Sequence, residues 1–157
     1  MNVIIEKNKF DVNKIIFLDS VKNTVINNGY FYRLLYSDEY FSLNSIYFTL
    51  DIKTKSIDRY FNKVKFNFEI HQNEKEIKIF EKIENDLLKK MNISKKKPVF
   101  KIKELFRNNY FKLFHNSSEP IYSNRLLLKV SGIWETSSEY GITYKIVIVW
   151  HNIQYSY

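Results

Sequence analysis

The last part of the chain carries the pattern that most narrows the folds open to it. Residues 125–150 read RLLLKVSGIWETSSEYGITYKIVIVW, in which apolar side chains recur at every second position on both sides of a polar TSSE segment. A period of two is typical of a β-strand, because successive side chains of a strand point to opposite faces. A polar segment followed by Gly141 is typical of a tight turn. The segment therefore predicts a long β-hairpin.

Other alternating segments predict further strands. Residues 63–70 show the clearest alternation, in which Val64, Phe66, Phe68 and Ile70 are expected to face inward and the polar residues between them outward. Strands are also expected at residues 13–18, 30–37, 45–52 and 110–114. Residues 99–106 fit either a strand or a short helix, and residues 116–124 are expected to form a polar loop.

Residues 74–91 follow a different period, which predicts one long helix. Their apolar positions are spaced by three or four residues, as on one side of an amphipathic helix: Ile77, Phe80, Ile83, Leu87 and Met91. Asn73 is expected to cap the first turn with its side chain. Acidic residues near the start and lysines near the end match the helix dipole.

The order of these elements predicts a fold class. Apart from the short segment at residues 13–18, which fits a sheet edge, three strands, one helix and three further strands give a mainly β, α+β fold with a mostly antiparallel sheet. A helix inserted between the third and fourth strands of a five-stranded barrel is the layout of an OB-fold. At 157 residues the chain has the length of one domain, residues 1–157.

The net charge of +8 is unevenly distributed along the chain. Residues 1–94 carry 15 basic and 13 acidic side chains, whereas residues 95–157 carry 10 basic and 4 acidic ones. A basic half with few acids is typical of a protein that binds a polyanion. Lysine-rich codon usage is an alternative cause, but it would raise lysine everywhere and would not deplete acidic residues in one half.

The aromatic content of 17% is a weaker indication of function. The chain has only 3 glycines and 2 prolines, and a surplus of Asn, Lys, Ile, Phe and Tyr, whose codons are rich in A and T. Genome composition can therefore account for many of the aromatic residues. Their positions, and not their number, carry the functional argument.

No signature of catalysis or metal binding is found in the sequence. It has 0 cysteines, its histidines at 71, 115 and 151 have no metal-ligand spacing, and it has no glycine-rich phosphate loop. We therefore expect no enzymatic activity, no cofactor and no bound metal. No secretory leader is found, and no apolar run approaches the roughly 20 residues of a spanning helix. We expect a soluble intracellular protein with no membrane partner.

The candidate binding residues are outward-facing aromatic and basic side chains. Single-stranded nucleic acids bind by stacking bases on aromatic rings and by pairing phosphates with lysine or arginine. Aromatic residues flank the predicted hairpin turn, and two lysines lie nearby. The candidates are Arg33, Tyr47, Lys63, Lys65, Lys95, Lys96, Lys97, Lys112, Arg125, Lys129, Trp134, Tyr140, Tyr144 and Lys145.

Each candidate also has a structural interpretation. The hairpin aromatics Trp134, Tyr140 and Tyr144 fit the core as well as a base-stacking surface. Arg33 faces outward if the alternating tyrosines of residues 30–36 face inward; in the reverse arrangement the tyrosines would stack on bases and Arg33 would need a buried partner. The first arrangement is favoured, because an exposed charge costs little. The lysines at 63, 65 and 95–97 fit a solvated surface as well as phosphate contact.

Two segments resemble a known family. The sequence VSGIWETSSEYGITYKI, residues 130–146, resembles the C-terminal signature of the OB-fold single-stranded DNA-binding proteins of large double-stranded DNA viruses, the nucleocytoplasmic large DNA viruses. The sequence KNTVINNGYFYRLLYSDEYFSLNSIYFTL, residues 22–50, is similar to the N-terminal core of that family. The resemblance implies an OB-fold β-barrel with an amphipathic helix between strands 3 and 4 and a long C-terminal hairpin.

The sequence thus favours a non-enzymatic protein that coats and protects single-stranded DNA without strong sequence preference. The resemblance implies a role in viral DNA replication, recombination or repair, at the site of viral DNA replication in the host cell. RNA is an alternative ligand, since nothing in the sequence distinguishes a 2′-hydroxyl. A second alternative is a structural or protein-interaction module without a nucleic-acid ligand, in which the aromatics only build the core. Self-association along the strand stays open.

Overall fold

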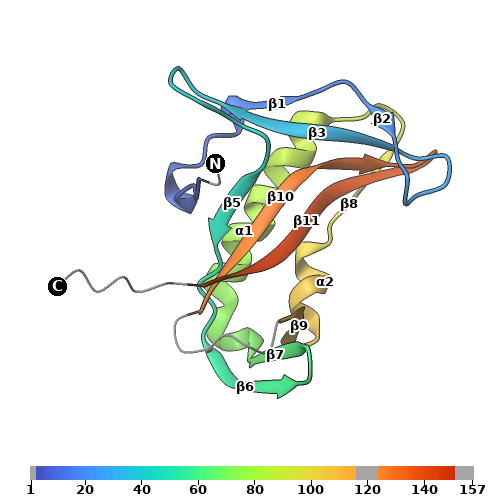
Figure 1. Cartoon of the computed structure of the whole chain (residues 1–157). Helices are drawn as coiled ribbons and strands as arrows, with labels where there is room; N and C mark the ends of the chain where they lie inside the picture. The colour runs from blue at the N-terminus through green and yellow to red at the C-terminus, as the bar shows by residue number, and fades with distance from the viewer. Residues whose placement is uncertain (1–2, 116–123, 151–157) are drawn as a thin grey trace.

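Strands make up most of the fold, and one long helix packs against them (Figure 1). The structure, a computed structural model, describes residues 3–115 and 124–150. Its helices are α1 (Ile70–Met91) and α2 (Ile102–Arg107), and two short 3-10 turns, η1 (Lys7–Lys9) and η2 (Val12–Lys14), lie near the start of the chain. This architecture confirms the predicted mainly β class with one long helix.

The larger sheet curls into a half-barrel. Its main strand order is β1-β3-β10-β11-β8, and the pairings are antiparallel except for that of β8 with β11. The strands are β1 (Ile15–Phe17), β2 (Val21–Lys22), β3 (Tyr30–Ser37), β4 (Ser42–Leu43), β5 (Ile46–Thr49), β8 (Lys97–Val99), β10 (Asn124–Glu135) and β11 (Glu139–Trp150). The last two form the predicted hairpin, and β1, β3 and β5 lie within the predicted strand segments.

Strand β10 is the centre of this sheet. It pairs with β11 along one edge and with both β5 and β3 along the other. Its first half pairs with β5 and its second half with β3, and the register shifts between Val130 and Gly132. A β-bulge of this kind bends the strand and increases its twist, which lets the two halves face different partners. Gly132 is required there, since an added Cβ would lie 2.1 Å from the Tyr32 carbonyl oxygen.

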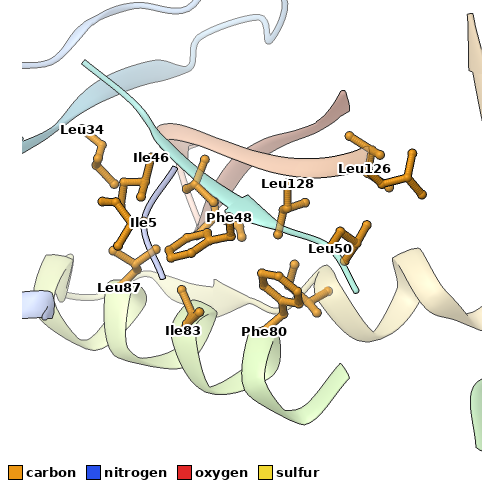
Figure 2. Packing of buried hydrophobic residues seen from close by; sticks show 14 of the residues in the cluster. Ile5, Leu34, Ile46, Phe48, Leu50, Phe80, Ile83, Leu87, Leu126 and Leu128 are labelled. Atoms are coloured by element: carbon orange, nitrogen blue, oxygen red, sulfur yellow. The ribbon is translucent and has the colours of Figure 1, made fainter. Parts of the chain in front are cut away.

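Helix α1 covers the inner face of the larger sheet. Leu34, Ile46 and Phe48 point from the strands toward Phe80 and Leu87 of the helix (Figure 2). The rings of Phe48 and Phe80 meet edge to face, with their centroids 5.9 Å apart. Burial of each large apolar side chain stabilises the fold by about 1.5–3 kcal/mol. The apolar period read from the sequence therefore places the core side of α1 correctly.

The start of α1 differs from the prediction. The helix begins at Ile70, four residues before the predicted start, and Glu69 is its N-cap. Asn73 is buried inside the first turn, where its Oδ1 accepts a hydrogen bond from the Lys53 backbone N at 2.7 Å. Its amide nitrogen donates to the backbone carbonyl of Lys53 at 3.2 Å. The prediction that Asn73 caps the helix is therefore wrong: its side chain joins the helix to the segment that follows β5.

A second, smaller sheet contains β6 (Thr54–Tyr60), β7 (Lys63–Phe68) and β9 (Tyr110–Phe114) in the order β6-β7-β9. The strands β7 and β9 were predicted, and Val64, Phe66 and Phe68 of β7 are buried as expected. The prediction that Ile70 faces inward on this strand is wrong, because Ile70 is exposed and begins α1. Its inner face packs on α2, where the ring of Phe106 lies 5.9 Å from Phe68 and 5.4 Å from Phe111. Strand β6 was missed, because its sequence TKSIDRY is polar on both faces and shows no alternation.

The ambiguous residues 99–106 contain both kinds of structure. Strand β8 ends at Val99 and α2 begins at Ile102. The carboxylate of Glu84, a buried residue of α1, accepts hydrogen bonds from the backbone N of Lys101 at 2.7 Å and of Ile102 at 3.2 Å. A side chain of one helix therefore caps the next. Burial raises the pKa of Glu84, and the nearby carboxylates of Glu81 and Glu104 raise it further.

The closed OB barrel is not confirmed. Hydrogen bonds divide the described strands between two sheets, and in residues 3–115 and 124–150 no strand pairing joins β9 to β11. Residues of both strands line a groove of about 630 Å³. Of the polar loop expected at residues 116–124, residues 116–123 lie outside the described part of the chain, and Asn124 begins β10.

Candidate nucleic-acid interface

The face of the larger sheet opposite α1 gathers five of the candidate residues. Directly opposite residues of antiparallel strands point to the same side, and Lys129 of β10 lies opposite both Tyr47 of β5 and Lys145 of β11. The ammonium of Lys129 lies 5.5 Å from the centre of the Tyr47 ring. The neighbouring positions, such as Phe48 and Leu128, are buried in the core. This row therefore points away from α1, as predicted for Tyr47.

The bulge in β10 brings Trp134 and Arg33 onto the same side. After the register shift, Gly132 lies opposite Arg33 of β3, and Trp134 lies opposite Gly141 of β11. Ile133, between them, is fully buried. The alternation therefore returns Trp134 to the outer side. We call the set of Arg33, Tyr47, Lys129, Trp134 and Lys145 the hairpin face.

Charge on the hairpin face is of one sign. Arg33 and Lys145 are exposed, and Lys129 is half-buried. Strands β3, β5, β10 and β11 contain only two acidic residues, Glu135 and Glu139, and both flank the hairpin turn. Glu135 is buried, and it accepts hydrogen bonds from the Tyr32 hydroxyl at 3.1 Å and the Lys96 ammonium at 2.9 Å. The outward strand positions therefore carry cations together with the rings of Tyr47, Trp134 and Phe31, which lies opposite Trp134.

Trp134 is half-buried, with its ring packed over the backbone of Gly141. An added Cβ at Gly141 would lie 2.7 Å from the six-membered ring, so only glycine lets the indole lie this close. The ring also lines a groove of about 650 Å³ together with Lys22, Phe31 and Lys101. One side of the ring therefore packs on the protein, while the residue still lines an open groove, and the stacking of Trp134 on a base stays a prediction.

Tyr140 and Tyr144 do not belong to the hairpin face. Tyr140 is only 4% exposed, and its hydroxyl donates to the Leu88 carbonyl of α1 at 3.4 Å. Its ring is part of the core, which corrects the expectation that it stacks on a base. Tyr144 lies opposite Val130 on the inner side and is half-buried, and burial raises the pKa of its hydroxyl. Both residues follow the core alternation of β11.

The three lysines at residues 95–97 differ in their contacts. Lys95 and Lys97 are exposed. The ammonium of Lys96 donates to the carboxylate of buried Glu135 and, at 2.7 Å, to the carbonyl of Thr136. Lys96 therefore neutralises a buried acid and holds the hairpin turn, which corrects its assignment as a phosphate ligand. Arg125 is exposed near the start of β10, at the far end of the hairpin from Trp134.

The remaining candidates lie on the smaller sheet. Lys63 and Lys65 of β7 and Lys112 of β9 share its outer face, in line with Tyr60, Tyr110 and Phe114. Each ammonium lies over a ring: Lys63 is 5.1 Å from the centre of Phe114, Lys65 is 4.4 Å from Tyr110, and Lys112 is 6.0 Å from Tyr60. We call these six residues the lysine–aromatic face.

The sequence reasoning missed the rings of this face. Tyr60 belongs to β6, which was not predicted, and the strand of Tyr110 and Phe114 was recognised without considering its outer side. The signal was present, since YFKLF alternates Tyr110, Lys112 and Phe114 with two apolar residues. The alternation of Lys63 and Lys65 with buried residues was used, but only for its charges.

No site for a metal is found in the described part of the chain. Residues 3–115 and 124–150 contain no group of three or more histidine, aspartate or glutamate side chains that could hold an ion. Over the same residues, no helix has the length and apolar character needed to cross a bilayer. Comparison with protein-family models, with curated proteins and with solved structures found no significant match. The family resemblance therefore stays a prediction.

Proposed function

We propose that this chain binds single-stranded DNA without strong sequence preference, through the hairpin face. One observation carries the proposal: three cations and two aromatic rings share one outward sheet face whose strands place their acidic residues only at the turn. Cations along such a face track the phosphates, and exposed ring surface stacks with bases of any sequence. Neither contact reads base edges, which is why the binding is non-specific.

The arrangement of the rings favours an unpaired strand over a duplex. Bases of a duplex are stacked on one another, so a ring such as Trp134 or Tyr47 has no free base to contact. An extended single strand presents its bases one at a time, and both rings lie on the face that carries Arg33, Lys129 and Lys145. Stacking contributes about 1–3 kcal/mol per base.

We further infer that the half-barrel belongs to the OB class. The curled sheet, the long helix after β7 and the long final hairpin support this assignment. The biological role that follows is the coating and protection of single-stranded DNA during viral DNA replication, recombination or repair, without catalysis.

The test is a titration of labelled oligonucleotides followed by fluorescence anisotropy. Oligo-dT should bind and duplex DNA should bind least at the same salt concentration, and comparison with oligo-rU decides between DNA and RNA as the ligand. A variant with Lys129→Gln and Lys145→Gln should bind dT more weakly, whereas Lys75→Gln with Lys78→Gln, on the exposed side of α1, removes the same charge as a control. Absence of binding to every probe would favour a structural module, and tighter binding of rU would reassign the ligand to RNA.

A further inference from the structure

The smaller sheet exposes more aromatic surface than its fold requires. Phe114 is 76% exposed, Tyr60 51% and Tyr110 37%, and all three rings lie on the same side of the sheet. The inner side of the sheet packs on α2 through other residues, such as Phe68 and Phe111, so the outer rings add nothing to that core. Exposed apolar area gathered in one patch marks a binding surface.

Phe61, at the tip of the β6–β7 hairpin, directly follows Tyr60 of this patch in the chain. It is fully exposed, and its φ of 45° lies in the left-handed region that glycine or asparagine adopts with less strain. A bulky ring at this position therefore stabilises neither the turn nor the core. Contact with a bound ligand would account for an aromatic residue at this position.

The charges around the rings select a polyanion. The three strands of the smaller sheet contain one acidic residue, Asp58, which lies opposite Lys65 on this face and accepts a hydrogen bond from the Asn67 amide at 2.6 Å. The three lysines of the face outnumber it. The three lysines of the lysine–aromatic face lie over rings. Cation–π contacts are weak at exposed sites, so a phosphate can draw each ammonium off its ring and leave the ring free for a base. A nucleic-acid strand repeats one anion and one planar group at every nucleotide, whereas a peptide does so only if its sequence alternates acidic and aromatic residues.

The groove between the two sheets connects this surface to the hairpin face. Its lining includes Tyr110, Lys112 and Phe114 from the lysine–aromatic face and Lys145 and Val147 from β11. Alternate residues along a strand are about 6.8 Å apart, so successive rows of the sheet can hold successive units of an extended chain. A strand that leaves the hairpin face at Lys145 therefore meets lysines and rings again directly across the groove.

We propose that the lysine–aromatic face, with Phe61, is a second binding surface for the same single strand of nucleic acid, which passes from the hairpin face across the groove between β9 and β11. The inference rests on the proposed function and adds to it a path and a length requirement. A short oligonucleotide occupies the hairpin face alone. A longer one contacts both faces and binds more tightly.

The test compares oligo-dT of about 6 nucleotides, near the lower end of the range bound by one OB domain, with oligo-dT of about 20, which exceeds that range. In the full chain, Phe61→Ser with Phe114→Ser should weaken binding of the long probe about 5- to 150-fold for each stacked base lost, and should change binding of the short probe less than about twofold. Tyr40→Ser, which removes an 88% exposed ring elsewhere, is the matched control and should change neither.

The outcomes separate the two proposals. If Phe61→Ser with Phe114→Ser binds both probes like the wild type while Lys129→Gln with Lys145→Gln still weakens binding, the second surface is refuted and the proposed function stands. If the double variant loses the short and long probes equally, the lysine–aromatic face is the primary site, and the proposed path is wrong. If the wild-type chain binds no oligonucleotide, both proposals fail. Circular dichroism confirms folding, which exposed substitutions should leave unchanged.

Discussion

At the scale of single residues, Trp134 and Tyr140 show how position on a strand decides what a ring can do. Both flank the same turn, and both were candidates for stacking. The bulge at residue 131 leaves Trp134 on the outer side, while Tyr140 follows the inner alternation and reaches α1. The alternation of β11 alone assigns Tyr140 to the core. The bulge could not be predicted, because it depends on two strands that share one edge of β10.

This difference predicts opposite effects of truncation. Trp134→Ala should weaken binding of oligo-dT by about 1–3 kcal/mol, with only a moderate loss of stability because the ring is half-buried. Tyr140→Ala should cost about 3–5 kcal/mol of stability and should not affect the affinity of the remaining folded protein. Urea denaturation and anisotropy measure the two quantities separately. Equal binding by folded Trp134→Ala would remove this ring from the interface.

Glu84 gives a prediction that depends on pH. Its pKa is raised by burial, so the folded state binds the proton more tightly than the unfolded state does. The free energy of unfolding should therefore rise as the pH falls through the raised pKa, and this gain should be complete below the ordinary value of 4.5. Glu84→Gln should lack the gain, so the stability of the wild type relative to this variant should increase on acidification. A decrease would show that the ionised carboxylate, through its two backbone hydrogen bonds, is the stabilising form.

At the scale of elements, the spacing of apolar residues predicted the strands and the helix in which that spacing is regular. Strands β3, β7 and β9, the final hairpin and the apolar side of α1 were all predicted, because each has a regular pattern of apolar residues in the sequence. Strand β6 has no buried side of its own and gives no signal, so the sheet it completes was not anticipated. Asn73 was assigned by its residue type, whereas its backbone partner at Lys53 lies 20 residues away in the chain.

The bulged strand β10 predicts a sharp dependence on Gly132. Gly132→Ala would force a methyl group to within 2.1 Å of the Tyr32 carbonyl oxygen, so β3 must move away from β10. We expect a loss of stability of at least about 1–3 kcal/mol, as for an overpacked core. Ser131→Ala, one residue before it in the bulge, should change stability by less than about 1 kcal/mol, since its hydroxyl makes one long hydrogen bond of 3.4 Å. Chemical denaturation would detect the contrast.

At the scale of the whole molecule, the distribution of charge along the chain predicted only part of the candidate site. The basic excess after residue 94 pointed to a polyanion, yet Lys96 turned out to neutralise Glu135 inside the protein. Lysines of the first half, Lys63 and Lys65, join Lys112 in one face only because β7 pairs with β9. A count of charges along the chain cannot predict a surface that is assembled across it.

The salt dependence of binding tests the whole electrostatic surface. For single strands, the slope of log affinity against log salt is about −0.7 for each phosphate neutralised, so several contacts predict a slope of about −2 to −4. Lys129→Gln with Lys145→Gln should reduce its magnitude by about 1.4, and the exposed helix pair Lys75→Gln with Lys78→Gln by nearly nothing. A flat salt dependence in the wild type would show that these lysines hold no phosphates.

The division of the strands into two sheets has a mechanical consequence. Within each sheet, backbone ladders resist stretching, but in the described residues no ladder crosses from β9 to β11. In those residues, side chains of both sheets and of the helices pack in one shared core, which holds the smaller sheet against the larger one. The molecule is therefore stiff along its strands and compliant across the seam. A bound nucleic-acid strand that spans the boundary between β9 and β11 would restrict the movement of one sheet relative to the other.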